Sequence, residues 1–510
     1  MIISDRRDQL PRLLAALTVL AGTAAWIVYL RAGLVLSHYD AKAHLVVARR
    51  IFDSLTPGWQ QVGAVWLPLP HLLNMLPAQV DVLYRTGAAG SIISILCFGL
   101  IAYASARLVL AVTGSSAGAT TAVAVLALNP NLLYLQSTPM TEPLLLALTS
   151  LVVLWMYAWV LADREDVPAR LGWVMVAATL TRYEAWPVVG AAVAAATYAT
   201  WRRGSPPGAT IRRGARLAAW PLAAVAAFLV NSRITVGSWF VSEGFYVPDP
   251  AYQGLASRTL ISVWWGTHQL SGYVVTTVAL VTAGLLIGRA LLRKRDSALL
   301  LPVASLAAAA LPLVAFYAGH PYRIRYMVPL VAAAAMLNGI AVGLAARRER
   351  RPAFLRRAAP LCAAAVVASA LIESPPWKQT APMLVEAQWD RPASAGRRRV
   401  TACLAPQYHG EKVLASMGSL AHYMQELSGS GFQIADFIHE GNGPIWNLAL
   451  DSGAAIHAGW MLVEEGAEGG DVLASRIERD SNFTSGMTRV CEGGGVALYR
   501  RTAEATNRGD

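Results

Sequence analysis

Charged residues are scarce in this chain of 510 residues: they make up 15% of it, against about a quarter in a typical soluble protein. Hydrophobic residues make up 55%, and several apolar runs approach or exceed the roughly 18 residues that mark a membrane helix. The shortage of charge argues against an ordinary soluble enzyme. It predicts a polytopic α-helical membrane protein.

Nucleotide and zinc signatures are also absent. The sequence holds no P-loop, no glycine fingerprint of a dinucleotide site and no clear zinc spacing, so an ATP-driven mechanism has no support. Cysteine is limited to four residues, of which Cys97 and Cys362 lie in apolar runs and are expected to be packing residues. Cys403 and Cys491 lie in the polar tail and can pair if that tail is outside the cytoplasm; spacing alone leaves this open.

The positive charge is unevenly distributed. The net charge is +12, but residues 373–510 hold 12 Lys/Arg and 17 Asp/Glu, so residues 1–372 carry 31 against 14. The arginines lie in short loops between apolar runs, as the positive-inside rule describes. We therefore expect membrane lipids as neighbours and no nucleic acid partner.

The apolar runs predict about eleven transmembrane helices. They lie at residues 12–31, 87–111, 117–135, 143–161, 171–182, 186–200, 217–232, 259–287, 298–318, 326–346 and 358–373. The basic loops 201–216, 289–295 and 347–357 are expected to be cytoplasmic. The N-terminus is then cytoplasmic and the first run a retained helix, whereas the loop 32–86 and the C-terminal region are extracytoplasmic. The expected location is the plasma (inner) membrane.

Four segments divide the chain. A transmembrane domain covers residues 1–373 and includes the outer loop 32–86 with a juxtamembrane helix. A linker follows at 374–390, then a small extracytoplasmic α/β domain at 391–502 and a disordered tail at 503–510. Within the α/β domain, "RRRVTACLAP", "KVLASMG", "AIHAGWMLVEE" and "GVALYRR" are predicted as strands, and "SLAHYMQEL" and "DVLASRI" as helices.

The stretch 171–200 is too long for one ordinary span and too short for two full ones. We predict two short helices that meet at "TRYEAWP", with Pro187 opening the second. Because backbone can turn at membrane depth only where protein or water covers it, this break indicates a cavity.

The segment "SHYDAKAHLVVARR" follows the first apolar run and has helical periodicity. Asp40 and His44 are four residues apart and therefore share a helix face. Asp40 can serve as a general base, with His44 beside it or acting as a metal ligand. Alternatively, Asp40 caps a solvated helix. The residues alone favour neither. The later segment "GAVWLPLPHLLNMLPA" is an apolar loop on the membrane that can also wall a lipid site near Asp40.

Further charged residues fall at predicted outer ends of helices. Glu142 in "TPMTEP" favours the dipole of the helix that it opens. Arg182 and Glu184 either neutralise each other or line a sugar or phosphate pocket. Positive charge on the outer side runs against the positive-inside trend, and it is present at His320, Arg323 and Arg325. An anion is the natural partner of these side chains, either a bound phosphate or bulk lipid headgroups.

These motifs, taken in order, resemble the GT-C superfamily of integral membrane glycosyltransferases, which includes polyprenyl-phosphate-mannose-dependent mannosyltransferases and lipid A aminoarabinose transferases. The resemblance covers roughly residues 12–346 and rests on "HYDAKAHLVVARR", "WLPLPHLL", "TPMTEPLLLAL", "TRYEAWP" and "YRIRYMVPL".

The resemblance implies a hexosyltransferase that moves a sugar, with inversion, from a polyprenyl-phosphate donor to an extracytoplasmic hydroxyl of a protein, lipid or glycan in the cell envelope. It implies Asp40 as the catalytic base. Arg323, Arg325 and Arg182 are candidates to stabilise the phosphate, with His320 and His44 nearby, and Glu142 and Glu184 are candidates to bind the sugar.

The sequence departs from the GT-C pattern in two respects, and two other functions compete with that of a glycosyltransferase. Many relatives have adjacent acids after the first span, whereas Ala41 follows Asp40, which argues against a metal-assisted version without excluding a divalent metal. The outer domain is not a constant feature of the family. A transporter or flippase for a lipid-linked glycan, and a non-catalytic envelope receptor or assembly protein, are the competing functions.

Overall fold

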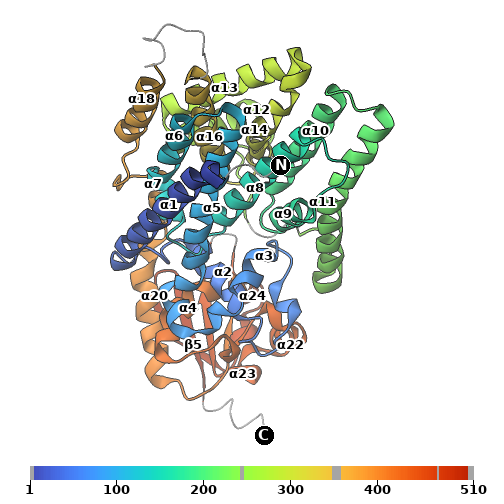
Figure 1. Ribbon diagram of the computed structural model, residues 1–510. Coiled ribbons are helices and arrows are strands. Elements are labelled where there is room, and N and C mark those ends of the chain that lie inside the picture. The colour runs from blue at the N-terminus through green and yellow to red at the C-terminus, as the bar shows by residue number, and fades with distance from the viewer. Residues whose placement is uncertain (1–4, 242–245, 347–357, 468–469, 503–510) are drawn as a thin grey trace. The chain divides into compact units, whose positions relative to one another are not determined.

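The structure is a computed structural model that describes residues 5–241, 246–346, 358–467 and 470–502. Contacts divide the chain into two compact units, whose elements are labelled in Figure 1. The first unit comprises Met1–Ala32, Ser91–Asn231 and Pro248–Glu386. The second comprises Gly33–Gly90, Ser232–Val247 and Ala387–Asp510, so it combines the first outer loop with the C-terminal region. Each unit is described by itself.

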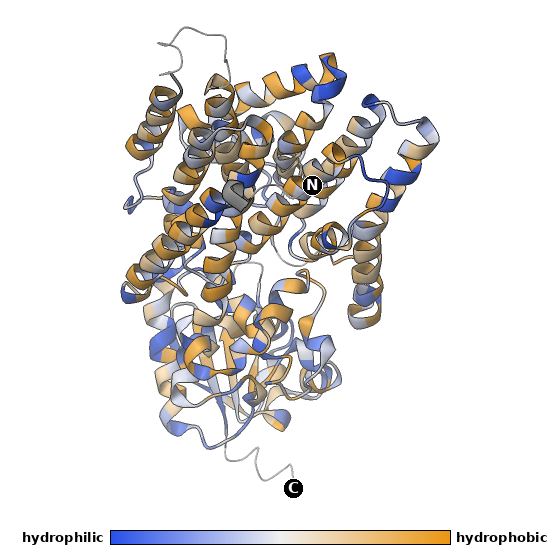
Figure 2. Ribbon diagram, in the orientation of Figure 1, coloured by the Kyte–Doolittle hydropathy of each residue, from blue (hydrophilic) through white to orange (hydrophobic). Residues whose placement is uncertain are grey.

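The first unit is helical. Its helices are α1 (Asp5–Arg31), most of α5 (Ala88–Thr113), α6 (Ser116–Ala127), α7 (Pro130–Leu135), α8 (Glu142–Leu161), α9 (Ala169–Thr179), α10 (Ala185–Arg202), most of α11 (Pro207–Val236), α12 (Ala256–Ser271), α13 (Tyr273–Leu292), η3 (Lys294–Leu299), α14 (Leu300–Ala304), η4 (Ser305–Ala309), α15 (Ala310–Tyr317), η5 (Ile324–Met327), α16 (Val328–Ala346), α18 (Ala358–Glu373) and α19 (Pro382–Glu386). Figure 2 shows that hydrophobic residues dominate the long helices.

Seven helices among the described residues are long and apolar enough to cross a membrane. Two shorter apolar helices, Ser116–Ala127 and Pro360–Glu373, accompany them. The chain is thus a multi-pass membrane protein, but the expected count of about eleven spans is not confirmed. Four of the predicted spans are not among the seven: 117–135 covers α6 and α7, 171–182 and 186–200 lie on α9 and α10, and 358–373 lies on α18. The predicted span 259–287 forms two helices, because Gly272, with a positive φ of 88°, separates α12 from α13. The basic loop 347–357 lies outside the described residues.

The break in the stretch 171–200 is confirmed. Helix α9 ends at Thr179 and α10 begins at Ala185, so Pro187 lies in the first turn of α10. Proline is tolerated there because the first backbone N–H groups of a helix have no partner within the helix. Residues 180–184 therefore form an irregular turn that carries Arg182 and Glu184.

Helices α6 and α16 pack closely in the first unit. A Cβ atom added to Gly118 would lie 2.4 Å from the carbonyl oxygen of Gly339, so only glycine allows the two backbones to come this close. Small residues at helix contacts are typical of membrane bundles, where close packing drives association.

The second unit contains the outer-loop helices and a five-stranded sheet. The outer loop forms α2 (Tyr39–Arg49), η1 (Trp59–Val62), α3 (Leu69–Asn74), η2 (Pro77–Gln79) and α4 (Asp81–Thr86). The C-terminal region forms α20 (Arg391–Leu404), η6 (Ala405–Gln407), β1 (Val413–Ala415), α21 (Met417–Leu427), η7 (Ser428–Ser430), η8 (Ile434–Asp436), β2 (Phe437–Ile438), η9 (Glu440–Asn442), α22 (Pro444–Ser452), α23 (Ala454–His457), β3 (Trp460–Glu464), α24 (Val472–Arg479), η10 (Ser481–Thr484), β4 (Met487–Gly493) and β5 (Val496–Arg501).

The sheet has the strand order β2-β1-β3-β5-β4. Strands β2, β1 and β3 are parallel, whereas β5 pairs antiparallel with both β3 and β4. The strands β1 and β3 are buried along their whole length, as expected for parallel strands covered on both faces. We refer to residues 391–502 as the sheet domain.

The strand predicted at "RRRVTACLAP" is wrong, because this segment lies within helix α20 and the turn that follows it. Its buried residues Gly396, Val400 and Leu404 recur every four positions, which is a helical period. Gly396 faces the turn between β4 and β5, where an added Cβ would lie 2.1 Å from the backbone nitrogen of Gly494. The other predicted strand segments contain β1, β3 and β5, the two predicted helices match α21 and α24, and β2 and β4 were missed.

Cys403 of α20 and Cys491 of β4 form a disulfide across 88 residues of chain. The sequence had left this pairing open. The bond ties the first helix of the sheet domain to its edge strand. Disulfides of this kind persist in oxidising compartments outside the cytoplasm.

Candidate functional site

Asp40 is the second residue of α2 and its side chain is buried, with 7% of its surface exposed. The N-cap of the helix is His38, whose Nδ1 accepts a hydrogen bond from the Asp40 backbone N–H at 3.0 Å. The alternative in which Asp40 caps the helix is therefore wrong, because His38 does so. A buried carboxylate in the first turn of a helix is stabilised by the helix dipole.

His44 lies one turn further along α2 and contacts the second motif of the outer loop. Its Nδ1 lies 3.0 Å from Nε2 of His71 in α3, and its ring packs 4.3 Å, centroid to centroid, from that of Trp66. Both histidines are buried, with 5% and 1% of their surfaces exposed. The apolar segment "WLPLPH" thus forms a wall against the helix that carries Asp40.

A short bond between two imidazole nitrogens requires one donor and one acceptor. One proton therefore lies between the two nitrogens, and any positive charge on the pair would be buried. Burial, followed by the nearby charges of His44 and Arg50, holds the pKa of His71 well below its usual range. His71 accordingly stays neutral near pH 7, and it packs against His44 on the helix that carries Asp40.

Buried neutral histidines recur in the sheet domain. Burial, then Lys42 and Arg397, lowers the pKa of His422 to about 2, and burial, then Arg50, lowers that of His439 to about 3. Below pH ~6.5 these two histidines bind protons in the unfolded chain but not in the folded chain. The free energy of unfolding should therefore fall as the pH is lowered. Glu440, whose pKa burial raises to about 7, opposes this between pH ~4.5 and 7.

The variant His422→Gln isolates one of these contributions. Its thermal unfolding temperature should depend less steeply on pH between 6.5 and 4.5 than that of the wild type, because one proton-uptake step is removed. The exposed His409 provides a matched variant, His409→Gln, expected to follow the wild type. Equal slopes for wild type and His422→Gln would refute a buried neutral His422.

Arg182 forms a buried ion network in the first unit. Its Nε and Nη2 donate to Glu184, the shortest contact being 2.7 Å, and its Nη1 lies 3.1 Å from Oε1 of Glu142. Nη1 also donates to the hydroxyl of Thr141 at 2.9 Å. Glu142 and Glu184 are 0% and 2% exposed. Arg182 and Glu184 thus pair with each other, which was one of the two alternatives, and Glu142 joins them from the start of α8.

This network contains two carboxylates and one guanidinium. Arg182 already donates to protein oxygens through Nε, Nη1 and Nη2, so its role with respect to a bound phosphate is reduced. Glu184 also lines a pocket between α8, α10, η4 and α16 that includes the hydroxyl-bearing Thr149, Ser150 and Ser305. Hydroxyl and carboxylate oxygens of this kind can hydrogen-bond the hydroxyl groups of a sugar.

His320, Arg323 and Arg325 lie together around η5 in the first unit. The Nδ1 of His320 lies 2.8 Å from the carbonyl oxygen of Pro321, and its Nε2 lies 3.1 Å from the hydroxyl of Tyr326. Nδ1–H therefore donates to the carbonyl, whereas Nε2 can accept from the hydroxyl or donate to it. The guanidinium of Arg325 lies 5.8 Å from the ring centre of Tyr326, and both arginines are half-buried.

Sequence reasoning missed a second segment at this position. The backbone of residues 249–254 hydrogen-bonds that of residues 317–319, through Asp249 N–H to Gly319 at 2.7 Å and Gly254 N–H to Tyr317 at 2.9 Å. Tyr252 then stacks on Tyr322 at 6.3 Å, and Arg258 lies 5.4 Å from the ring centre of Tyr252. No sequence motif predicted this pairing of the two segments. The only available indication was the presence of aromatic residues near the predicted membrane interface.

The predicted site residues therefore fall into three local groups. Asp40 and His44 lie on one helix of the second unit. Glu142, Arg182 and Glu184 form one network of the first unit, and His320, Arg323 and Arg325 form another group there. Their convergence on one outer face remains a prediction. Among the described residues, no group of three or more His, Cys, Asp or Glu side chains is placed to hold a metal ion.

No protein-family model and no curated protein matches the chain. Among solved structures, the chain is similar to the oligosaccharyltransferase of Archaeoglobus fulgidus, whose crystal structure holds zinc and sulfate. The identity is 11% and the TM-score is 0.45, over 88% of this chain and 67% of that one. A likeness at this level does not establish a family.

Proposed function

We propose that this chain is a membrane glycosyltransferase that moves a sugar from a polyprenyl-phosphate donor to an extracytoplasmic acceptor hydroxyl, with inversion. The observation that carries the proposal is Asp40, a buried carboxylate at the start of a helix directly after the first apolar helix. The order of the GT-C-like motifs along the sequence supports it. Asp40 is the proposed catalytic base.

The residues suit the chemistry of this transfer. An acceptor hydroxyl loses its proton as it attacks the anomeric carbon, and a positioned carboxylate can accept that proton. The bond from the anomeric carbon to the phosphate oxygen breaks at the same time, so negative charge develops on the lipid phosphate. Fixed positive charge stabilises such a leaving group, and Arg323 and Arg325 are the proposed source.

Other roles follow from the local groups. Glu184, which lines the pocket of the first unit, is proposed to bind sugar hydroxyls, whereas Glu142 and Arg182 hold Glu184 in place. His44 and His320 are proposed to contact substrate as hydrogen-bonding groups. The disulfide between Cys403 and Cys491 supports an extracytoplasmic sheet domain. A cytoplasmic N-terminus and a cell-envelope acceptor are further parts of the proposal.

The test is a transfer assay with the purified full chain in liposomes. Polyprenyl-phosphate sugars labelled in the sugar are supplied with an envelope extract as acceptor, and matched nucleotide sugars form the control arm. Label should enter the acceptor fraction only from the lipid-linked donor. Transfer from the nucleotide sugar in liposomes free of polyprenyl phosphate would contradict the donor class.

A transporter or flippase is the second candidate, favoured by the buried ion network of Arg182, because charges buried in a membrane helix bundle often serve transport. The same liposomes distinguish the two functions. A flippase would move labelled lipid between leaflets without any transfer of the sugar.

A further inference from the structure

The sheet domain has a recognisable ligand edge. In sheets with parallel strands, ligands bind outside the carboxyl ends of the strands, where the following loops and helix N-termini present polar groups. Here that edge is formed by the residues after β1 and β2, namely Met417 and Gly418 at the start of α21 and Glu440, Gly441 and Asn442 in η9. We call these residues the carboxyl edge.

Side chains of the outer loop occupy this carboxyl edge. The hydroxyl of Tyr39 donates to the carbonyl of Gly418, and the guanidinium of Arg50 contacts the sulfur of Met417 while its Nε donates to the carbonyl of Gln61 at 2.6 Å. The amide of Gln61 donates to the carbonyl of Gly441 at 2.8 Å. Arg50 and Gln61 are 5% and 0% exposed, so their side chains are buried, whereas the hydrogen bond from Tyr39 to Gly418 is exposed.

Further contacts extend this attachment along the outer loop. Asn442 donates to the hydroxyls of Ser54 and Thr56 at 3.2 and 3.1 Å, and Leu55 packs against the hydrophobic core of the sheet domain. A Cβ on Gly441 would lie 2.8 Å from Oε1 of Gln61, so the two segments fit closely.

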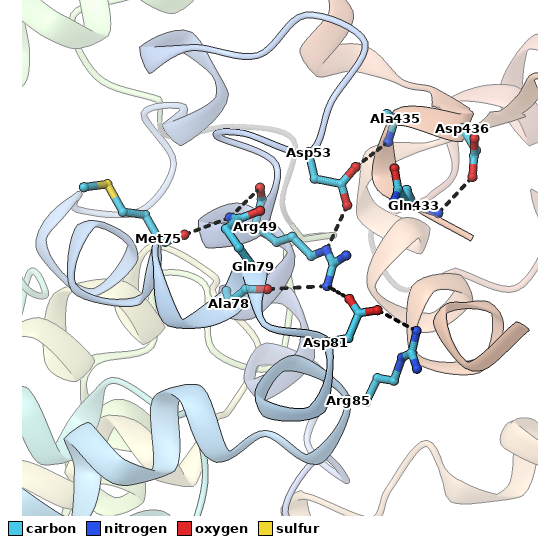
Figure 3. Close-up of polar contacts among 10 residues, drawn as sticks. All are labelled: Arg49, Asp53, Met75, Ala78, Gln79, Asp81, Arg85, Gln433, Ala435 and Asp436. Atoms are coloured by element: carbon cyan, nitrogen blue, oxygen red, sulfur yellow. Dashed lines mark hydrogen bonds and ion pairs between the residues drawn. The ribbon is translucent and has the colours of Figure 1, made fainter. Parts of the chain in front are cut away.

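The end of α2 is held by a second connection, which Figure 3 shows. Arg49 donates to Asp53 and to Asp81, each at 2.8 Å, and the other oxygen of Asp53 accepts the backbone N–H of Ala435 at 2.9 Å. Arg49 thereby links α2 to the first residue of α4 and, through Asp53, to the segment that precedes β2.

The helical period separates these contacts from Asp40. Tyr39, Lys42 and Arg50 lie on the face of α2 that meets the sheet domain, since 3.6 residues make one turn. Lys42 on this face lies 3.4 Å from Nδ1 of His422 in α21. Asp40 and His44 project from the adjacent face, where His44 meets Trp66 and His71. The sheet domain thus contacts α2 through Tyr39 and Lys42.

We propose that the sheet domain is the scaffold that positions the proposed catalytic helix: its ligand edge binds the outer loop of its own chain, with Tyr39 and Gln61 as positioning residues. This inference rests on the proposed function, in which Asp40 is the base. It assigns the carboxyl edge to an intramolecular partner, and it makes the sheet domain part of the transferase.

Two near-isosteric variants test the proposal in the full chain. Tyr39→Phe removes the hydroxyl that binds Gly418, and Gln61→Met removes the amide that binds Gly441. Neither residue is placed among the reacting groups. Arg489→Ala on β4, which breaks an exposed ion pair with Glu465, is the matched control. Deleting the sheet domain would uncover the buried face of α2 and is a poorer test.

Two measurements are made on each variant. The two changes are also combined in one double variant, Tyr39→Phe with Gln61→Met. In this double variant, hydrogen exchange of residues 39–62 should accelerate about tenfold, with exchange in β1 and β3 unchanged. The kcat of transfer should fall up to about 100-fold with the KM for the lipid donor unchanged, because displacement of the base by about 1 Å can cost that much. Arg489→Ala should match the wild type in both measurements.

The outcomes separate this proposal from the function on which it rests. Faster exchange with an unchanged kcat would overturn the positioning role while the wild-type transfer preserved the proposed function. Unchanged exchange would overturn the attachment itself. Absence of transfer by the wild type from any donor would remove the proposed function, and with it this role, although the exchange data would still report whether the edge holds the outer loop.

Discussion

Replacing Asp40 by asparagine is expected to lower the rate of glycosyl transfer by about 100- to 10,000-fold, the usual contribution of a general base. Asparagine keeps the shape of the side chain but cannot accept the proton of the acceptor hydroxyl. The assay supplies labelled polyprenyl-phosphate sugar to purified wild type and Asp40→Asn at matched protein levels. Because the change affects chemistry, kcat should fall and the KM for the donor should change little.

Two controls accompany this measurement. Asp451→Asn makes the same chemical change at an exposed position of α22 and should leave transfer unaltered. The unfolding temperature of Asp40→Asn should stay close to that of the wild type, because loss of a charge near a helix N-terminus typically costs about 0.3–1 kcal/mol. Transfer by Asp40→Asn at the wild-type rate would rule out Asp40 as the base and direct attention to Glu184.

The sequence predicted the helical and membrane character of the chain well. Apolar runs of membrane length, the turn at "TRYEAWP" and the helix of Asp40 and His44 all depend on local spacing, which a sequence displays directly. The number and the bounds of the spans were harder to predict. Gly272 interrupts the run that was predicted as one span, and whether a single glycine interrupts a helix depends on tertiary packing.

The local groups of the candidate site show the same limit. The pairing of Arg182 with Glu184 was visible because the two residues are neighbours in one turn. The addition of Glu142, some 40 residues earlier, depends on how α8 packs beside α10. His71 likewise reaches His44 across 27 residues. Contacts between residues this far apart in the sequence are determined by tertiary packing and leave no periodic signal in the sequence.

The attachment of the outer loop to the sheet domain was the least predictable feature. Tyr39 and Gly418 are 379 positions apart, and neither residue type is unusual in its local sequence. Gly441 and Asn442 lie in "FIHEGNGPIW", a segment rich in turn residues whose partner could not be inferred from composition. Only the assembled sheet places the ends of β1 and β2 beside each other and so creates the edge.

The variant Arg182→Met is expected to be the most destabilising single change in the first unit. It leaves Glu142 and Glu184 buried without a counter-charge, and breaking a buried pair in this way typically costs about 3–5 kcal/mol. A cost of that size corresponds to a fall in unfolding temperature on the order of 10 °C. Transfer should be lost as well, because Glu184 lines the pocket. Arg216→Met, which breaks an exposed pair with Asp166, should change little.

Because the network holds two carboxylates and one guanidinium, its members should differ in how much their loss changes the stability. Glu142→Gln removes a surplus negative charge and leaves the closer pair of Arg182 and Glu184 intact, so it should be near neutral or stabilising. Glu184→Gln removes the carboxylate that receives Nε and Nη2 and should cost more. Unfolding temperatures of the three variants in one detergent test this order. A loss in Glu142→Gln as large as that in Arg182→Met would show that both carboxylates are needed, as an additional bound cation would require.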